Sequence, residues 1–409
     1  MSNFSIDFPV SSYKDWYEKA IKTLKNSSFE ELKSTNSDNI TIEAYYNSEN
    51  TKSTNFILKN QNCNIITPYY PSFENDVNGF IFTNEIQTNI ESDKKVFYDF
   101  SSHSEINTLS RNDKNQIFIL NDLFTEYEKN GKWTHSLADN LSVFSKQNKK
   151  LNMCVDISLH QNAGATISQQ IAYFLSKVNE LVGFFGPEIL KNILVKTAIG
   201  SDFFTEIAKL KVLRILFQKI AEEYKIEAEL HIFCETTFRN KSTIDKENNL
   251  IRSSLESISA IIGGANFLSI QPYQNWNNPT EQDWEIAYKQ FLVLSHESML
   301  NFFDDATSNA YFIENLTSEL AQKSWKLFQN IENENGYLYF LESGKLKSEI
   351  EKALQEEIDK IESNEIILIG INESKSDSIG FEFNDSQNSY LSPKRLAQNY
   401  EQQCKRQEK

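Results

Sequence analysis

The chain has 409 residues, 39% of them hydrophobic and 24% charged, which is typical of a globular protein. Its 57 acidic and 41 basic residues give a net charge of −16, and no stripe of Lys and Arg offsets it, so a nucleic acid is excluded as the expected partner. The chain begins without a basic segment and apolar run, and no stretch reaches about 18 apolar residues. We therefore expect no secretory signal and no membrane span, and a cytoplasmic location. Four cysteines without metal-binding spacing predict reduced core thiols.

Residues 1–60 are polar and acidic and predict an arm rather than a core domain. Helical patterns cover Tyr13–Leu24 and Phe29–Leu32. Large apolar side chains recur along the arm at Phe4, Phe8, Trp16, Tyr17, Ile21 and Phe29. Such side chains are unfavourable in water but enriched at obligate interfaces, so we expect a segment that wraps another subunit. Packing against the chain's own core domain is the alternative.

Short apolar runs alternate with amphipathic helices from residue 79 onward, which is typical of repeated β/α units and a parallel sheet. Seven runs are strand candidates: 79–86, 96–100, 116–120, 153–158, 193–199, 229–235 and 267–270. A separate β-rich piece at 64–67, followed by a turn at 68–71, precedes them. Seven strands are one short of a closed eight-stranded barrel.

The helices between and after these strands are better defined. Residues 203–224 place their apolar side chains in one stripe at a spacing of about 3.6, which predicts packing on a sheet. Helices at 249–262 and 316–332 end at or near glycine. After a charged helix at 345–361 and an apolar run at 366–369, the composition turns to Ser, Asn, Asp, Gln and Lys and predicts disorder. The predicted domains are an arm at 1–60, a β/α domain at 61–345, a helix and strand-like segment at 346–372, and a disordered tail at 373–409.

Four segments, in order along the chain, carry a resemblance to a known family. They are residues 163–166 (Ala-Gly-Ala-Thr), 199–214 (beginning Ile-Gly-Ser-Asp-Phe-Phe), 248–264 (ending Gly-Gly) and 311–372. Together they resemble the barrel domain of the methylmalonyl-CoA mutase family. The fold that this implies is α/β, a (β/α)8 TIM-type barrel, complete or one strand short, with an N-terminal arm and a C-terminal helix.

Each of these segments also has an explanation that is purely structural. Gly200 and Ser201 fit the chemistry of a turn and a helix cap. The charges of Glu206, Lys209 and Arg214 fit a solvated or salt-bridged helix face. The motifs therefore identify a fold, and a site has to be argued separately.

The resemblance implies the rearrangement of an acyl-CoA, started by adenosylcobalamin. The cofactor supplies the radical chemistry, and the protein holds and orients the reactants. In the family a flavodoxin-like domain carries an Asp-x-His-x-x-Gly motif whose imidazole coordinates cobalt. The five histidines here, none of which stands in this motif, are His103, His135, His160, His231 and His296. We therefore expect no cobalamin-binding flavodoxin-like domain, and no cofactor or metal bound by this chain.

The substrate pocket that the resemblance implies is expected to be degenerate. In active members a His four residues before the Ala-Gly-Ala motif contacts the thioester carbonyl, and Leu159 holds that register here. A shift of one residue would make His160, followed by Gln161, the residual catalytic candidate. The family's Thr-Ser-Gly-Trp loop is replaced by residues 235–239 (Glu-Thr-Thr-Phe-Arg), which puts a carboxylate near a polyanionic substrate.

Two further features of that pocket are also missing from the sequence. The family's arginine-containing helix after the last strand reads Glu-Ile-Ala-Tyr-Lys-Gln at 285–290, and its Arg- and Tyr-rich segment has no counterpart at 75–83. The predicted degenerate pocket comprises Leu159, His160, Gln161, Glu235, Thr236 and Arg239.

These departures predict the non-catalytic small subunit of a heterodimeric mutase, a pseudoenzyme whose large partner binds adenosylcobalamin and interconverts methylmalonyl-CoA and succinyl-CoA. One alternative is an active acyl-CoA mutase barrel that uses a separate cobalamin-binding protein. Another is a stand-alone remnant that binds an acyl-CoA. Co-purification with a larger cobalamin-binding chain distinguishes the small subunit from the stand-alone remnant.

Overall fold

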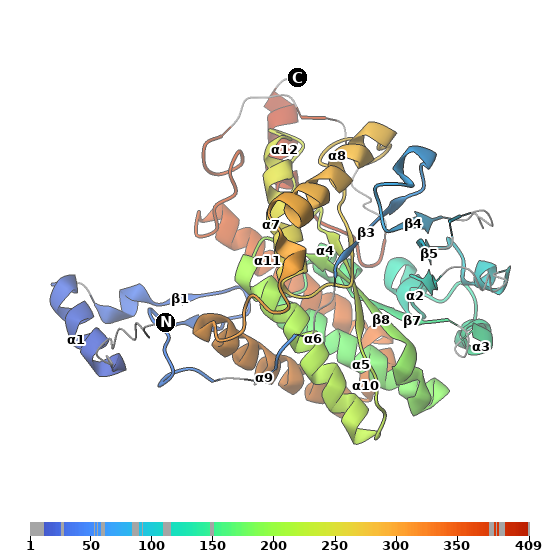
Figure 1. Cartoon of the computed structure of the whole chain (residues 1–409), viewed down its shortest axis with the longest axis horizontal. Coiled ribbons are helices and arrows are strands. Elements are labelled where there is room, and N and C mark those ends of the chain that lie inside the picture. Colours follow the sequence, from blue (N-terminus) through green and yellow to red (C-terminus); the bar gives the residue numbers. More distant parts are fainter. Residues whose placement is uncertain are drawn as a thin grey trace, which may run out of the picture.

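A computed structural model gives the arrangement of most of the chain (Figure 1). It describes residues 12–25, 28–52, 54, 56–58, 62–83, 90–91, 93–108, 116–147, 151–375, 380–381, 383 and 389–407. Among these residues, no helix is long and apolar enough to cross a membrane. The four cysteines are free, and three of them are buried, in agreement with the expected core thiols.

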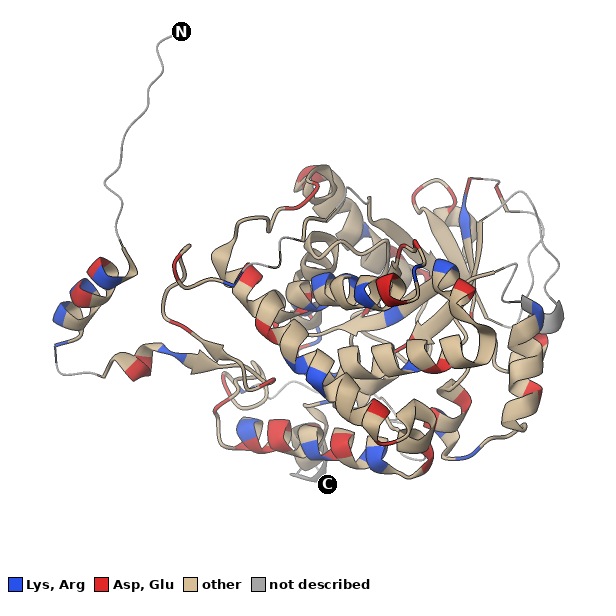
Figure 2. Ribbon diagram, turned by 90° about the horizontal axis from the view of Figure 1, so that it is seen from below, with Lys and Arg blue, Asp and Glu red and all other residues tan. Residues whose placement is uncertain are grey.

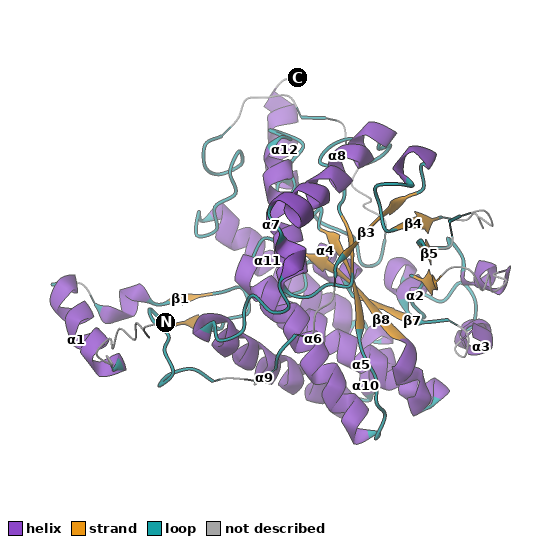
Figure 3. Cartoon of the chain, in the orientation of Figure 1, coloured by secondary structure: helices purple, strands orange, loops and turns teal. Residues whose placement is uncertain are grey.

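Eight parallel strands form the centre of the molecule, with helices around them (Figure 3). Their order is β6-β5-β4-β3-β10-β9-β8-β7. The strands are β3 (Asn64–Pro68), β4 (Gly79–Phe82), β5 (Lys95–Tyr98), β6 (Gln116–Ile119), β7 (Met153–Asp156), β8 (Ile193–Ile199), β9 (His231–Thr236) and β10 (Phe267–Ser269). Each strand pairs with its neighbour in the chain except at β6 and β7, and β10 pairs with β3, so the strands follow one another around a barrel.

The barrel closes at the seam between β6 and β7. One parallel bridge joins Asp122, just after β6, to Cys154 in β7. The Asn152 side chain accepts a hydrogen bond from the Ile119 amide at 2.8 Å and donates one to the Ile119 carbonyl at 2.9 Å. A carboxylate oxygen of Asp122 accepts from the Asp156 amide at 2.6 Å. The expected barrel fold is therefore confirmed, with side chains completing the seam.

The piece at 64–67, which the sequence set apart from the barrel, is its missing strand. As β3 it pairs with β10 through Asn64 and Ile65 and with β4 through residues 66–68. It is followed only by the short 3-10 helix η2 (Pro71–Phe73), so the helix that marks a β/α unit is absent. The barrel is complete in strands, and this first connection is shorter than a β/α unit.

The connections differ strongly between the two halves of the barrel. In the described part of the first half, η2 and η3 (His103–Thr108) are followed by α2 (Thr125–Asn130) and α3 (Leu137–Gln147). The second half has full helices: α4 (Ser158–Ala163), α5 (Ile167–Phe185), η4 (Pro187–Asn192), α6 (Phe203–Glu223), α7 (Asn248–Ile262) and α8 (Glu281–Leu292). The segments after α8 are the π-helix η5 (Val293–Glu297), η6 (Leu300–Phe302), α9 (Tyr311–Asn333), α10 (Gly336–Glu342), α11 (Lys345–Glu362) and α12 (Gln398–Gln407). Helix α9 packs across α5 and α6 as a second layer.

Aromatic rings fill the interior of the barrel. Phe97 on β5 is fully buried, and its ring lies 4.8 Å from Phe118, 5.2 Å from Phe233 and 5.0 Å from Phe267, measured between centroids. These rings come from four strands and share one apolar cluster with Ile66, Leu120 and Leu194. The interior is thus a packed core at this level and not a channel.

The N-terminal arm stands away from the barrel in both ribbon views (Figures 1 and 2). Helix α1 (Tyr13–Leu24) has no buried residue, and Trp16 stacks on Tyr45 at 4.8 Å between ring centroids. After η1 (Phe29–Leu32), the two-stranded sheet of β1 (Ser34–Thr35) and β2 (Thr41–Ile42) docks on the helices through the turn between its strands. The Asp38 carboxylate accepts from the Ser168 amide at 2.8 Å at the start of α5. The arm is therefore anchored at its root, while α1 makes its contacts within the arm.

The expected disorder from residue 373 onward does not describe residues 389–407. These form an extended segment and α12, with Leu391, Arg395 and Ala397 buried. The prediction from polar composition was wrong here because a buried ion pair and a few apolar side chains, Leu391 and Ala397 among them, hold the segment in place. The apolar run at 366–369 is not a strand and makes only an isolated bridge, Ile369 to Glu373.

Candidate functional site

The carboxyl ends of the strands form the face where TIM barrels carry their active sites. Above the aromatic core, Lys196 of β8 lies between two carboxylates: its Nζ is 3.5 Å from Asp156 Oδ2 and 3.5 Å from Glu235 Oε2. The Ser158 hydroxyl also donates to Asp156, at 2.6 Å. Asp99, after β5, adds a further negative charge close to Lys196 and Glu235. One ammonium thus faces three carboxylates at the mouth of the barrel.

The electrostatics of this mouth follow from burial and from Lys196. Burial raises the pKa of Glu235, and the charge of Lys196 only partly opposes this. For Asp156 burial also acts to raise the pKa, but Lys196 and the Ser158 hydrogen bonds outweigh it and the pKa falls. Burial would lower the pKa of Lys196, yet Asp156 and Glu235 hold it well above the usual value. The excess of negative charge disfavours an acyl-CoA carboxylate or phosphate at this position.

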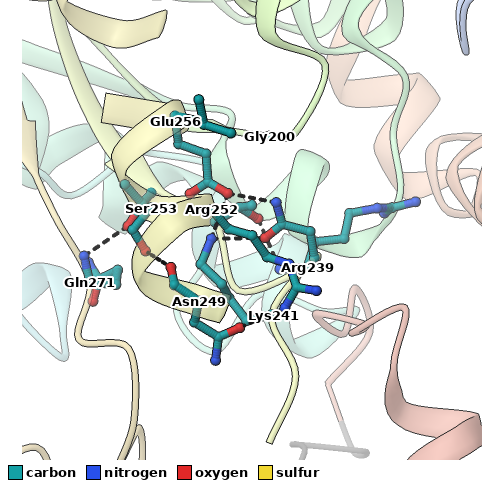
Figure 4. A network of polar contacts seen from close by, with 12 residues as sticks. Gly200, Arg239, Lys241, Asn249, Arg252, Ser253, Glu256 and Gln271 are labelled. Atoms are coloured by element: carbon teal, nitrogen blue, oxygen red, sulfur yellow. Dashed lines mark hydrogen bonds and ion pairs between the residues drawn. The ribbon is translucent and has the colours of Figure 1, made fainter. Parts of the chain in front are cut away.

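An ion pair and hydrogen bonds with helix α7 hold the loop that follows β9 in place (Figure 4). Glu256 on α7 accepts from Lys241 Nζ at 2.6 Å and from Asn240 Nδ2 at 2.7 Å, and both charged side chains are buried. Asn249 holds the Ser242 carbonyl at 2.7 Å, and Arg252 donates to Asn249 Oδ1 at 3.0 Å. These cations are engaged within the protein, so they are not available as donors to a bound phosphate.

Gln161 and Arg239 meet beside a cavity of about 90 Å³, which is lined by the segments after β7, β8 and β9 and by α11. Arg239 Nη1 donates to the Gln161 carbonyl at 3.1 Å, and its other terminal nitrogen forms an ion pair with Glu357 of α11. Glu206, which also lines the cavity, accepts from the Gly200 amide at 2.8 Å. This cavity joins two of the predicted pocket residues, but the barrel interior lies elsewhere.

The charged face of α6 is buried, which corrects the solvated alternative. Lys209 Nζ lies 2.5 Å from Glu206 Oε2 and donates to the Ala198 carbonyl at 2.6 Å. Arg214 donates to the Gly264 carbonyl at 2.5 Å. Their partners lie at the end of β8 and in the loop before β10, so these polar side chains are paired between α6 and the barrel.

His160 points away from the barrel mouth into a second buried cluster. Its Nε2 lies 3.2 Å from both Glu128 Oε1 and the Tyr337 hydroxyl. Lys177 completes the cluster at 2.6 Å from Glu128 Oε1. The strand predicted at 153–158 ends at Asp156, and the segment that carries His160 turns into α4.

The other predicted pocket residues are also dispersed. Leu159 is half-buried and packs on the apolar core, and Thr236 Oγ1 accepts from the Gln271 amide at 2.9 Å between β9 and β10. Of the predicted set, only Glu235 lies in the polar layer of the barrel mouth with Lys196. Among the described residues no group of His, Cys, Asp and Glu could hold a metal ion.

Sequence reasoning missed Lys196 and Lys177, although both leave a signal. Lys196 is the only charged residue in the apolar run of β8, and Lys177 stands within the largely apolar helix α5. A lone lysine within an element that is buried on all sides predicts a buried ion pair. Its partners are distant in the sequence and could not be named from it.

A C-terminal strap, residues 389–401, crosses the barrel mouth. Its backbone amides donate to segments that follow three different strands: Leu391 to the Glu128 carbonyl in α2 at 2.9 Å, Lys394 to the Asn162 carbonyl in α4 at 2.8 Å and Leu396 to the Arg239 carbonyl after β9 at 2.8 Å. Arg395 pairs with Glu401 through two bonds of 2.9 and 2.7 Å, and both side chains are buried. Glu401 also accepts from the Thr243 amide at 2.8 Å. The strap therefore covers the face on which a barrel enzyme admits its ligand.

We predict that Arg395→Ala releases the strap. Burial acts to raise the pKa of Glu401, but Arg395 outweighs it and keeps the carboxyl ionised, so the substitution leaves an uncompensated buried charge at a cost of about 3–5 kcal/mol. Limited proteolysis read by mass spectrometry should show cleavage within 389–401 at least roughly tenfold faster. Lys394→Ala, at the neighbouring position, is the control and should leave the rate unchanged. Equal rates for both variants would contradict the role given to the ion pair.

Comparison with known proteins places this architecture in a family. The family model described as methylmalonyl-CoA mutase matches residues 103–409. The methylmalonyl-CoA mutase of Rhizobium meliloti is 30% identical over 248 residues, which is 58% of this chain and 35% of that protein. The small subunits from Porphyromonas gingivalis and Propionibacterium freudenreichii are 29% and 28% identical, over 52% and 50% of this chain and 36% and 33% of theirs.

The chain thus spans about a third of the length of these relatives. The family match covers about three quarters of the chain, from η3 through strands β6 to β10 and their helices to the strap, and strands β3, β4 and β5 precede it. The eight-stranded barrel and the ordered segments that carried the resemblance agree with it. This chain belongs to the methylmalonyl-CoA mutase family.

Proposed function

We propose that this chain is the non-catalytic small subunit of a two-chain methylmalonyl-CoA mutase, and that its large partner binds adenosylcobalamin and rearranges the acyl-CoA. Among the relatives, Porphyromonas gingivalis and Propionibacterium freudenreichii each have a chain named small subunit and a chain named large subunit. The role of this chain is then structural support within the heterodimer.

The observation that carries the proposal is the filled barrel. Four phenylalanine rings occupy the interior at contact distance, so an extended pantetheine-like chain finds no passage along the barrel axis. The mouth above them carries Asp99, Asp156 and Glu235 against one lysine. An acyl-CoA brings several negative charges, and the arrangement opposes its binding both by volume and by charge.

The described residues do not fit a cobalamin at this face either. A corrin ring needs a broad open surface. The strap lies across this face of the barrel, from Glu128 in α2 to Arg239 in the loop after β9. His160 is the histidine nearest to the motifs of the family, and it is fully buried against Glu128 and Tyr337. These features support a cofactor site in the partner, and we derive no reaction step from this chain.

The test is equilibrium dialysis of the purified chain with adenosylcobalamin, with and without the large chain from the same source. We expect no stoichiometric retention by this chain alone, and stoichiometric retention by the complex. Retention of one equivalent by this chain alone would overturn the proposal. It would also contradict the active barrel, which takes its cobalamin from a separate protein. Failure to associate with the large chain would favour the stand-alone remnant.

A further inference from the structure

Helix α7 exposes apolar side chains, whereas a surface helix usually exposes polar ones. It lies on the outside of the barrel, yet of its 15 residues only Ile251 and Leu255 are exposed, by 63% and 50%. The spacing of four places both on one face. The neighbouring helix α8 behaves as expected, since its exposed residues are Glu281, Gln282 and Lys289. In a chain of net charge −16, an outer helix that turns only apolar side chains to solvent indicates a covered surface.

The apolar face continues onto the segment after α8, which contacts α7 through η6. Phe302 and Phe303 are exposed by 74% and 62%, with Val293 and Met299 exposed beside them. We call these four residues, together with Ile251 and Leu255, the apolar face. Aromatic residues and Met are the types enriched at protein interfaces.

The backbone holds these side chains outward at a conformational cost. Met299 has φ +54°, a left-handed conformation that is unfavourable for a residue with a Cβ, and a π-helix precedes it. The Asn301 side chain pins the turn to the base of β3, donating to the Cys63 carbonyl at 3.1 Å and accepting from the Cys63 amide at 3.3 Å. A strained turn that is fastened from beneath and exposes two phenylalanines is typical of a preorganised contact.

The two phenylalanines supply part of the area that a stable complex uses. At 150–250 Å² for a whole aromatic side chain, the exposed parts of Phe302 and Phe303 alone offer roughly 200–350 Å². A stable interface needs about 800 Å² from each partner. The exposed carboxylates Glu297 and Asp304 flank the phenylalanines as a polar rim.

We infer that the apolar face is the docking surface for the barrel of the large subunit. This inference rests on the proposed function and specifies where its partner binds. A second copy of this chain is less suitable, because each copy carries a net charge of −16 and the two would repel each other. A lipid surface lacks the cations it would need, since the exposed residues of α7 and of 293–304 include no Lys or Arg.

Sedimentation velocity of this chain mixed with the large chain tests the inference. The double variant Phe302→Asp with Phe303→Asp should raise the dissociation constant by roughly tenfold or more, because charged side chains replace the centre of the contact. The double variant Ile251→Asp with Leu255→Asp should do the same. Since all four side chains are at least half exposed, thermal unfolding should match the wild type, and Tyr339→Asp on α10, exposed by 48%, is the control.

The outcomes separate the two proposals. If the wild-type chain does not bind the large chain, the proposed function fails. If the wild type binds and both double variants bind equally well, the proposed function stands and the docking surface is wrong. If the wild type forms a dimer alone and the variants are monomeric, the occupant is a second copy and the assignment to the large subunit is overturned.

Discussion

Lys177→Met should lower the free energy of unfolding by about 3–5 kcal/mol at neutral pH, because it removes the cation from a buried cluster of two carboxylates. Lys177 is fully buried, and its Nζ lies 2.6 Å from Glu128 and 3.1 Å from Asp122. It also donates to the Asp156 carbonyl at 2.8 Å. Methionine fills similar volume, so the loss measures the uncompensated carboxylates rather than a cavity.

The pH dependence gives this prediction a second readout. In the wild type, burial acts to raise the pKa of Glu128, but Lys177 and His160 outweigh it and lower the pKa to about 2, below the usual value of 4.5. The contribution of Glu128 is therefore present above about pH 4.5 and is lost as the pH falls towards 2. Without Lys177, burial dominates and the folded pKa lies above the unfolded one, so acidification stabilises the variant. The difference in the free energy of unfolding between the wild type and Lys177→Met should therefore decrease as the pH falls from 7 to 4.

Guanidinium unfolding at several pH values measures both effects. Lys191→Met is the matched control, because Lys191 pairs with Glu188 at 2.7 Å on the surface and such pairs contribute about 0–1 kcal/mol. A loss below about 1 kcal/mol for Lys177→Met, or a gap that does not change with pH, would show that the cluster is not held by this charge.

Phe97→Ala should cost about 3–5 kcal/mol, because it removes the ring that contacts all three other phenylalanines of the barrel interior. The side chain is fully buried, and the strands on each side cannot collapse into the space without breaking their hydrogen bonds. The same variant tests the filled barrel as a block to ligands. If volume alone excludes an acyl-CoA, the variant should begin to bind one, whereas the carboxylates of the mouth lead us to expect no binding.

Urea unfolding and isothermal titration with an acyl-CoA measure the two consequences. Phe302→Ala provides the control, since it removes the same atoms from a side chain that is 74% exposed and should change stability by less than about 0.5 kcal/mol. Equal losses for Phe97→Ala and Phe302→Ala would contradict the packed interior. Submillimolar acyl-CoA binding by Phe97→Ala would show that the charged mouth is no barrier.

Much of the fold could be predicted because it depends on local sequence patterns. The strands of the second half and the helices 203–224 and 249–262 lie within a few residues of their observed bounds, since apolar periodicity and terminal glycines are local signals. The first strand was predicted as a β-rich piece but set apart from the barrel, because only a turn joins it to the second strand. The strap was missed because it is held by pairings over long sequence separations. Composition has no information about such pairings.

The candidate site was less predictable than the fold. The motifs correctly marked the loops after β7, β8 and β9, but the direction of each side chain depends on where the strand ends. The early end of β7 turns His160 into the Glu128 cluster, and the partner Lys177 comes from another helix. Glu235 keeps its inward position because it follows Phe233 by two residues on the same face of β9.

The seam between β6 and β7 gives the barrel a mechanical asymmetry. Elsewhere neighbouring strands are joined by runs of backbone hydrogen bonds, whereas here one bridge and the side chains of Asn152 and Asp122 make the join. Asp122 is itself held by Lys177. The barrel is therefore an eight-stranded sheet whose two end strands are joined by few contacts. A fluctuation that opens the barrel would begin between β6 and β7.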